Sequence, residues 1–323
     1  MKNLALLLPY DYQLMSVASI LDVFETVNSI YAHRGKELPF HITLLRTKDQ
    51  LAEAGAGFHH HKVRSTSGRT KYDVVLIPAF TTRDIKATTR RNSAYAKWLK
   101  EQFEAGCDMA SFCTGAFLFA EAGLLNGRLA TTHVDYCSDF IVGYPRSFTK
   151  PGRTLTVDGR CFTSGGSTSA FHLLVFLVQK YCGNEIAVRI SKIFAIELDR
   201  HQQSYFSTFR PDYSHNDDLV KKVQRRIESN FGSIQTIDEI TRDLPSSRRN
   251  IVRRFKTVTG VPPIEYLQNI RIETAKKKLE QTDLSISEII SETGYADPKS
   301  FRKVFTKLVG IKPLEYREKF KIK

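Results

Sequence analysis

The sequence lacks long apolar runs. No apolar stretch among its 323 residues reaches the length of a membrane span. Its N-terminus also lacks the basic segment, apolar core and cleavage site of a secretory signal. We therefore expect a cytoplasmic protein without membrane contact.

Cysteine pairs and metal-ligand clusters are missing as well. The five cysteines are an odd number, are widely spaced and form no Cys-x-x-Cys, which argues against a disulfide framework and a zinc site. The adjacent His59, His60 and His61 have no evident cysteine or carboxylate partners, and such runs are usually loop residues. We expect neither a metal nor a cofactor.

Acidic residues are scarce relative to basic ones. The chain has 48 Lys and Arg against 34 Asp and Glu, a net charge of +14. From Asp217 onward there are 23 basic and 15 acidic residues, so the excess is densest in the last third. A segment that meets nucleic-acid phosphate has this character, although the charge by itself is equally compatible with general solubility.

One pattern occurs twice in that last third, at residues 237–267 and 286–317. Each copy has Ile-x-Glu-Ile, a turn, a basic helix ending in Phe-x-x-x-x-Gly, and then Pro and Glu-Tyr. Two basic helices at a fixed spacing can enter two successive turns of a DNA major groove. One such helix would more simply be the solvated face of a helical bundle, but two copies in matching register favour DNA binding.

Helical spacing separates an apolar face from a basic face in both copies. The predicted inner residues are Ile251, Phe255, Val258, Phe301, Phe305 and Leu308. Ser246 or Ser247 can cap the first helix, and Asp297 the second. Arginine and lysine suit the outer face because they bond guanine edges and phosphates. The residues that we assign to DNA are Arg248, Arg249, Val252, Arg253, Lys256, Lys299, Ser300, Arg302, Lys303 and Thr306.

Residues 219–319 resemble the DNA-binding domain of the AraC/XylS transcription regulators, in which a long helix joins two helix-turn-helix units. The joining helix is expected at 264–281 and contains the family-like Arg-Ile-Glu-x-Ala. The chain departs from the family at Thr241 and Ile290, where alanine is usual, and at Lys278, where leucine is frequent. The resemblance implies double-stranded DNA and RNA polymerase as partners, and a homodimer.

The N-terminal part alternates strand and helix patterns. Apolar runs at 3–9 and 73–78, with a weaker one at 40–45, predict buried parallel strands. Helical patterns occur at 14–32, 95–105 and 169–181, and a hairpin is expected at 154–166. These patterns predict an α/β domain with a largely parallel sheet flanked by helices, followed by an all-α domain. We place the α/β domain at 1–199, a polar, aperiodic linker at 200–218 and the all-α domain at 219–323.

Cys113 stands where a short strand is expected to run directly into a helix. The positive end of a helix dipole lowers a thiol pKa, so this position predicts a reactive cysteine. His133, twenty residues later, is a candidate base or hydrogen-bond partner.

The stretch 108–133 resembles the PfpI and class I glutamine amidotransferase-like superfamily. It is most similar to GlxA-type regulators, which fuse that flavodoxin-like fold to an AraC-type domain. Cys-Thr-Gly-Ala-Phe, Ala-Gly-Leu-Leu and Ala-Thr-Thr-His carry the resemblance, and residues 163–178 match the next block.

The catalytic parts of the enzyme relatives are altered. Ser16 stands where those relatives have an acid, and Ala79 and Phe80 stand where they have glycines with amides free for an oxyanion. Thr114 replaces a frequent histidine, and Val134 replaces a tryptophan. Because a nucleophile needs a placed base and a stabilised oxyanion, we expect no catalysis.

The expected site is instead a ligand pocket or redox-sensitive site lined by Ser16, Phe80, Cys113, Thr114 and His133. The leading hypothesis is a sequence-specific DNA-binding transcription regulator that senses a small-molecule effector or dimerises through its N-terminal domain. One alternative is a cysteine-dependent amidase or hydrolase that carries a DNA-binding domain. Another is an N-terminal domain that only dimerises.

Overall fold

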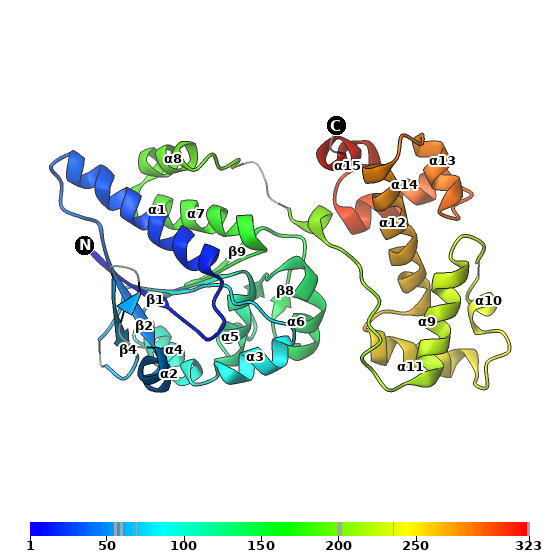
Figure 1. Ribbon diagram of the computed structural model, residues 1–323, viewed down its shortest axis with the longest axis horizontal. Coiled ribbons are helices and arrows are strands. Elements are labelled where there is room, and N and C mark those ends of the chain that lie inside the picture. Colours follow the sequence, from blue (N-terminus) through cyan, green and yellow to red (C-terminus); the bar gives the residue numbers. More distant parts are fainter. Residues whose placement is uncertain (55–56, 59–60, 69, 199–201, 235, 322–323) are drawn as a thin grey trace. The chain divides into compact units, whose positions relative to one another are not determined.

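The computed structural model describes residues 1–54, 57–58, 61–68, 70–198, 202–234 and 236–321. The chain divides into two compact units, Met1–Gln203 and Ser204–Lys323 (Figure 1). No helix in these described ranges combines the length and hydropathy of a membrane span.

The first unit is built on a mixed, mostly parallel sheet. Within the described residues it has eight strands in the order β3-β4-β2-β1-β5-β6-β10-β9, and a small second sheet pairs β7 with β8. Neighbours from β4 to β10 are parallel, while β3 and β9 are antiparallel at the two edges. The strands are β1 Lys2–Leu7, β2 Phe40–Arg46, β3 Gly57–Phe58, β4 His61–Ser65, β5 Val74–Ile77, β6 Asp108–Phe112, β7 Leu129–Ala130, β8 Phe148–Thr149, β9 Leu155–Asp158 and β10 Cys161–Ser164. The predicted α/β fold with a largely parallel sheet is confirmed.

Helices cover both faces of this sheet (Figure 1). Apolar residues of α1, α7 and α8 form a core on one face, and those of α4 and α5 form a core on the other. The helices of this unit are α1 Leu14–His33, α2 Lys48–Ala54, α3 Ile85–Arg91, α4 Tyr95–Glu104, α5 Ala116–Glu121, α6 Cys137–Gly143, α7 Ala170–Cys182 and α8 Asn184–Ile193, with single 3-10 turns at Cys113–Gly115, Val134–Tyr136 and Ser167–Ser169.

Local sequence patterns account for these elements. All residues of Leu4–Leu7 and of β5 are fully buried, as expected for central strands covered on both faces. The α1 residues Val17, Ile20 and Phe24 recur at helical spacing and are fully buried. The predicted hairpin forms from β9 and β10, with the positive φ of Gly159, +58°, at its turn.

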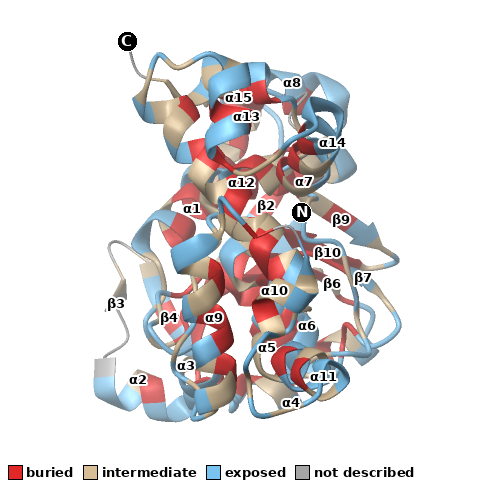
Figure 2. Ribbon diagram, turned by 90° about the vertical axis from the view of Figure 1, so that its right-hand side faces the viewer, coloured by how far each residue is buried: buried red, intermediate tan, exposed pale blue. Residues whose placement is uncertain are grey.

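The second unit contains no strand among its described residues. Its helices are α9 Asp218–Asn230, α10 Ile237–Thr241, α11 Arg248–Thr259, α12 Pro263–Gln281, α13 Ile286–Glu292, α14 Pro298–Val309 and α15 Pro313–Phe320. They enclose two separate cores: one joins α9, α10 and α11 to the first half of α12, and the other joins α13, α14 and α15 to its second half. Buried and exposed residues lie on opposite sides of these helices, as amphipathic helices require (Figure 2).

Much of the segment that we assigned to the linker packs as part of the second unit. Gln203 ends the first unit, and residues 204–217, which we name the strap, begin the second. Tyr205 of the strap is 6% exposed within the core around α14 and α15, and Phe209 packs on the core around α11. The aromatic side chains explain the packing, because each removes a large apolar area from water. Residues 199–201 lie outside the described ranges.

Candidate DNA-binding and effector sites

The first basic helix, α11, is set by a local cap and by two buried side chains. Ser247 accepts a hydrogen bond from the Asn250 amide at its start, and Gly260 ends it with a left-handed φ of +80°. Ile251 and Phe255 are buried, and Phe255 meets the ring of Tyr266 edge-on at 5.3 Å. The opposite side of the helix is therefore free to face a ligand.

The second basic helix, α14, repeats this construction. Asp297 accepts hydrogen bonds from the amides of Lys299 and Ser300, as its predicted capping role requires. Phe301 and Phe305 are fully buried. Leu308, the predicted third inner residue, is half-buried and packs against the core, and Val309, which is 2% exposed, is buried more deeply. Position 309 follows Phe305 by four residues, one helical turn, and so continues the buried stripe.

Of the ten residues assigned to DNA, nine are exposed and Val252 is half-buried. Three already have side-chain partners within the protein, and one of these is Ser300, whose Oγ donates to Asp297 Oδ2 at 2.7 Å. Arg248 pairs with Asp238 of α10 at 3.0 Å, and Arg253 donates to Asn250 Oδ1 at 2.9 Å. The other basic side chains assigned to DNA are exposed on α11 and α14.

Two basic residues, Lys307 in the last turn of α14 and Lys312 just beyond this helix, were missed by the sequence analysis. A groove of about 720 Å³ is lined by the assigned Arg302, Lys303 and Thr306, and also by Lys307 and Lys312. Lys312 is the N-cap of α15, and its position directly before Pro313 was the signal that could have identified it. The second helix-turn-helix therefore presents a wider basic surface than α14 alone.

Cys113 occupies the turn between β6 and α5. Its φ is +56°, in the left-handed region that non-glycine residues rarely adopt. Gly115 allows the turn to lie against β5, since a Cβ there would stand 2.5 Å from the Ile77 carbonyl oxygen. Thr132 Oγ1 donates to the Cys113 carbonyl at 2.9 Å. The expected strand-to-helix turn is present.

The thiol differs from the sequence-based expectation. Burial raises the pKa of Cys113 to about 11, although the Thr114 and Ser167 amides act in the opposite direction. The side chain is 3% exposed, and α5 spans only Ala116–Glu121, which makes its dipole weak. The prediction of a thiol pKa lowered by the helix was therefore wrong, because desolvation of the thiolate outweighs a short helix.

Two side-chain hydroxyls occupy the amides that could otherwise hold an oxyanion. Ser16 Oγ accepts from the Ala79 amide at 3.0 Å. Thr114 Oγ1 accepts from the Phe80 amide at 2.9 Å and donates to the Phe80 carbonyl at 2.8 Å. The backbone after β5 is thus bound by Ser16 and Thr114, two residues that depart from the pattern of the enzyme relatives.

His133 lies beside the loop that follows β10. Its Nδ1 accepts from the Asp135 amide at 3.2 Å, and burial lowers its pKa. A Cβ at Gly166 would lie 2.9 Å from the His133 ring, so the imidazole packs directly on the backbone of Gly166. A neutral ring whose Nδ1 accepts carries its hydrogen on Nε2, where it can donate.

Gln203 is a buried residue of this region that the sequence analysis missed. Its Oε1 accepts from the Gly166 amide at 2.9 Å, and its Nε2 donates to the Thr132 carbonyl at 2.9 Å. It is 2% exposed. Gln203 thus joins the loop beside His133 to the residue that bonds Cys113, and it directly precedes the strap. Nothing in its polar sequence context indicated this position.

The structure describes only one of the three adjacent histidines, so it does not test whether the three bind a metal together. His59 and His60 lie outside the described residues. His61 lies on β4, with its Nε2 2.8 Å from Glu25 Oε1. No cluster of three metal-ligating side chains occurs among the residues whose positions are described.

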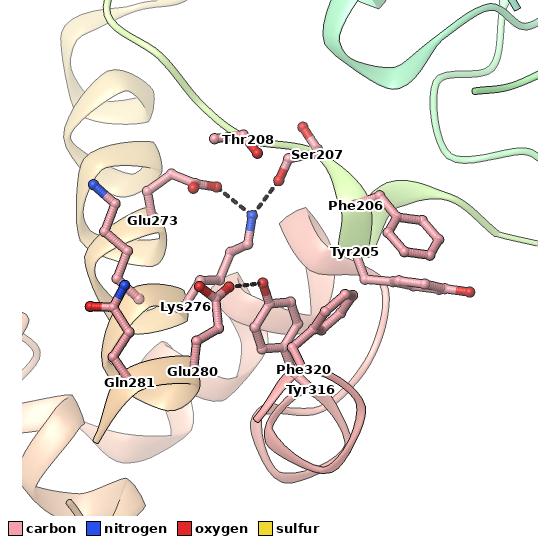
Figure 3. A pocket seen from close by; sticks show the side chains of 11 residues that line it. Tyr205, Phe206, Ser207, Thr208, Glu273, Lys276, Glu280, Gln281, Tyr316 and Phe320 are labelled. Atoms are coloured by element: carbon pink, nitrogen blue, oxygen red, sulfur yellow. Dashed lines mark hydrogen bonds and ion pairs between the residues drawn. The ribbon is translucent and has the colours of Figure 1, made fainter. Parts of the chain in front are cut away.

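A cavity of about 500 Å³ lies between the strap and helices α12 and α15 (Figure 3). Lys276 reaches into it and donates to the Ser207 carbonyl, and its Nζ lies 2.6 Å from Glu273 Oε1. Tyr316 donates to Glu280 on the other side. The ammonium of Lys276 is thereby the cation that ties the strap to α12.

Comparisons with known proteins cover both units. The family model for the DJ-1/PfpI family matches residues 7–180, and a helix-turn-helix domain model matches residues 240–319. The chain is 24% identical over 318 residues to the HTH-type transcriptional regulator GbdR of Pseudomonas aeruginosa, covering 98% of this chain and 84% of that protein. It is 24% identical over 230 residues to the HTH-type transcriptional regulator GlxA of Rhizobium meliloti, covering 70% of each. Among solved structures, an AraC family transcriptional regulator from Pseudomonas putida aligns with a TM-score of 0.48 and 17% identity, over 60% of this chain and 100% of that chain.

Proposed function

This chain belongs to the DJ-1/PfpI family and is an AraC-type transcription regulator that binds DNA, and we propose that its N-terminal unit senses a small-molecule effector and does not catalyse a reaction. The observation that carries the proposal is the pair of hydrogen bonds from Ser16 and Thr114 to the backbone after β5. They engage the Ala79 and Phe80 amides that acyl-transfer chemistry would need.

Two physical requirements of cysteine catalysis support this conclusion. An oxyanion is stabilised by donors that point at it without competing partners. A nucleophilic cysteine must also be a thiolate near neutral pH. With a pKa raised to about 11, Cys113 is almost entirely protonated at pH 7.

We place the effector beside Ser16, Phe80, Cys113, Thr114 and His133. Support comes from Phe80, which follows β5, and from Cys113 and Thr114, which follow β6, since ligands of parallel α/β sheets bind beyond the carboxyl ends of the strands. A ligand that favours one position of the loop at Gly166 would change the hydrogen bonds of Gln203, and so bias the start of the strap. This gives effector binding a physical route toward the DNA-binding unit.

We further propose that α11 and α14 read DNA through the ten assigned residues, and that the working form is a homodimer which contacts RNA polymerase. Both helices are capped, are anchored in a core by buried aromatic side chains and are basic on the outside, which supports their role in reading DNA. The resemblance to AraC-type regulators supports the homodimer and its contact with RNA polymerase. Light scattering on the protein with and without operator DNA measures the oligomeric state.

The effector hypothesis is tested with full-length protein and a duplex selected from random DNA. The affinity for this duplex is expected to fall steeply between low and moderate salt, because phosphate contacts release counterions. Small-molecule fractions of a cell extract are expected to change the affinity of the wild type, and alteration of Cys113 to Ser is expected to change that response. Fractions that leave the affinity unchanged at every concentration would count against sensing.

The enzyme alternative has one observation in its favour, the positive φ of Cys113, which is a strained turn of the kind found at active sites. The wild type and Cys113→Ser are therefore assayed side by side on simple amides and esters. We expect no saturable turnover by either protein. Saturable hydrolysis by the wild type that disappears in Cys113→Ser would establish the enzyme instead.

A further inference from the structure

The long helix α12 belongs to two cores, and one charged residue lies at the boundary. Tyr266 and Leu267 are buried in the core around α9 and α11. Ile272 and Ala275 are buried in the core around α13 and α14. Arg271 stands between these two sets and is itself 7% exposed.

The Arg271 guanidinium contacts both halves of the DNA-binding unit. Its Nε donates to the Phe231 carbonyl at 2.9 Å, and its Nη2 donates to the Ile234 carbonyl at 2.6 Å. Both carbonyls belong to the loop between α9 and α10 of the first half. The guanidinium carbon lies 5.1 Å from the ring centre of Tyr295, in the turn between α13 and α14.

The same two loops also touch through their backbones. Gly294 has a φ of +79°, and a Cβ there would stand 2.5 Å from the Gly232 carbonyl oxygen and 2.7 Å from Arg271 Nη2. Tyr295 continues the contact into the second half, where its ring meets Phe301 of α14 at 5.3 Å. A chain of direct contacts therefore runs from the α9–α10 loop through Arg271 to the second basic helix.

The chemistry of arginine suits this position. A planar guanidinium donates along two fixed directions, so it can bind two carbonyls, and its flat face can stack on an aromatic ring. Burying the charge costs free energy, and this burial lowers the pKa of Arg271. The contacts of Arg271 offset that cost only while the α9–α10 loop and the α13–α14 turn keep one relative position. Arg271 therefore favours a single arrangement of the two halves.

Two other arginines provide an internal comparison. Arg226 also donates to backbone carbonyls, those of Ile240 and Arg242, but all three residues lie in the first half. Arg317 donates to the Leu284 carbonyl within the second half. Each of them fastens one half, whereas Arg271 fastens one half to the other.

We propose that Arg271 is a positioning residue that fixes the phase between the two basic helices α11 and α14, by which we mean their relative position and orientation. It thereby sets the spacing of the two DNA half-sites that the chain accepts. It reaches DNA only through the loops that it holds. The proposal rests on the DNA-binding function above. Because two linked binding modules gain affinity only when geometry lets both engage, loss of the phase should reduce the gain from the second half-site.

The experiment uses full-length protein and a duplex selected from random DNA by the wild type, with its two half-sites mapped by footprinting. Affinities are measured for this duplex, for a version with two base pairs inserted between the half-sites, and for a version with one half-site scrambled. The insertion rotates one half-site by about a fifth of a helical turn. For the wild type we expect it to lower the affinity about tenfold or more.

Arg271→Met is expected to bind the duplex with one scrambled half-site as tightly as the wild type does, and to bind the uninserted duplex less tightly. Insertion of two base pairs is expected to lower its affinity by less than about threefold. Arg226→Met is the matched control, and it should keep the wild-type loss on insertion even if its affinities are lower. Thermal unfolding establishes which variants are folded. If Arg271→Met is unfolded, Arg271→Lys carries the test, because one ammonium cannot bind both carbonyls along fixed directions, and an intermediate loss on insertion is expected.

A folded Arg271 variant that keeps the full wild-type loss on insertion would overturn the proposal. So would one that loses single-half-site binding in the same proportion as two-site binding, since that result indicates a purely structural role. Failure of the wild type itself to bind any selected duplex would instead contradict the DNA-binding function.

Discussion

At Cys113, two local effects act on the thiol in opposite directions. Backbone amides at the start of a helix favour the thiolate, and enclosure by the sheet and its helices disfavours it. Enclosure is stronger here, since the residue is 3% exposed and its pKa is raised to about 11. Cys107, Cys137 and Cys161 are also buried, and burial raises the pKa of each thiol. The N-terminal unit therefore keeps its buried thiols protonated.

This residue-scale result predicts the pH dependence of thiol labelling. Alkylation of Cys113 by iodoacetamide should be slow at pH 7 and rise about tenfold per pH unit up to about pH 10, in proportion to the thiolate fraction. The labelled peptide is quantified by mass spectrometry, with Cys113→Ser as the control that identifies it. A labelling rate that is already constant above pH 8 would show a pKa lowered below the ordinary value of 9.0 and would revive the enzyme alternative.

The raised pKa of Cys113 also determines how the stability of the protein changes with pH. The folded-state pKa of Cys113 lies above the ordinary value of 9.0, so the folded state holds the proton more tightly. The resulting stabilisation is fully present below pH 9 and is lost as the pH rises through about 11. The free energy of unfolding of Cys113→Ser should therefore fall less steeply than that of the wild type over this interval.

At the scale of the element, each basic helix has buried side chains that anchor it in a core on one side and exposed basic side chains, which we propose contact DNA, on the other. Phe255 and Phe301 are fully buried, one in each core of the second unit. Arg253 and Lys303 are exposed on the opposite sides of the same helices. Changes on the two sides should therefore have separable effects.

Phe255→Ala and Phe301→Ala are each expected to lower the free energy of unfolding by about 3–5 kcal/mol, because a large buried ring leaves a cavity. Arg253→Ala and Lys303→Ala should leave unfolding nearly unchanged and relax base preference, by about 1–3 kcal/mol where a base contact is lost. Chemical denaturation and binding to a panel of single-base variants measure the two effects. Arginine variants that melt early while keeping their specificity would show that the two faces are reversed.

At the scale of the whole molecule, the strap is the segment through which the first unit continues into the second. It holds both helix-turn-helix halves, because Tyr205 packs in one core and Phe209 meets Tyr266 of the other at 5.1 Å. Tyr213 donates to Glu228, and Asp217 pairs with Arg254. The strap is thus a structural part of the DNA-binding unit.

Fragments that differ only in the strap test this role. A fragment of residues 204–323 should bind DNA by itself and be more stable than one of residues 217–323, by about 3 kcal/mol or more from the burial of two aromatic rings. Both fragments retain Asp217, which caps α9, so the comparison isolates residues 204–216 of the strap. Equal unfolding temperatures for the two fragments would show that the strap contributes no stability.

Short-range features of this protein were determined by the sequence itself. The spacing of Ile251 and Phe255 predicts the buried side of α11, and Asp297 before Pro298 predicts the start of α14; the structure confirms both. Apolar runs likewise predict the central strands. These features depend on residues within one or two turns of each other, so local periodicity and capping are sufficient to recognise them. The assignment of particular residues to DNA and to an effector stays a prediction.

Only the tertiary structure decided the features that join distant residues. The hydroxyl of Ser16 binds the amide of Ala79, Gln203 reaches the Thr132 carbonyl, and Arg271 reaches Phe231. The thiol pKa of Cys113 depends on enclosure by several elements, which is why the local helix alone gave the wrong direction. Burial and side-chain hydrogen bonding are properties of the packed chain, and no local pattern specifies which distant carbonyl or amide a buried side chain will meet.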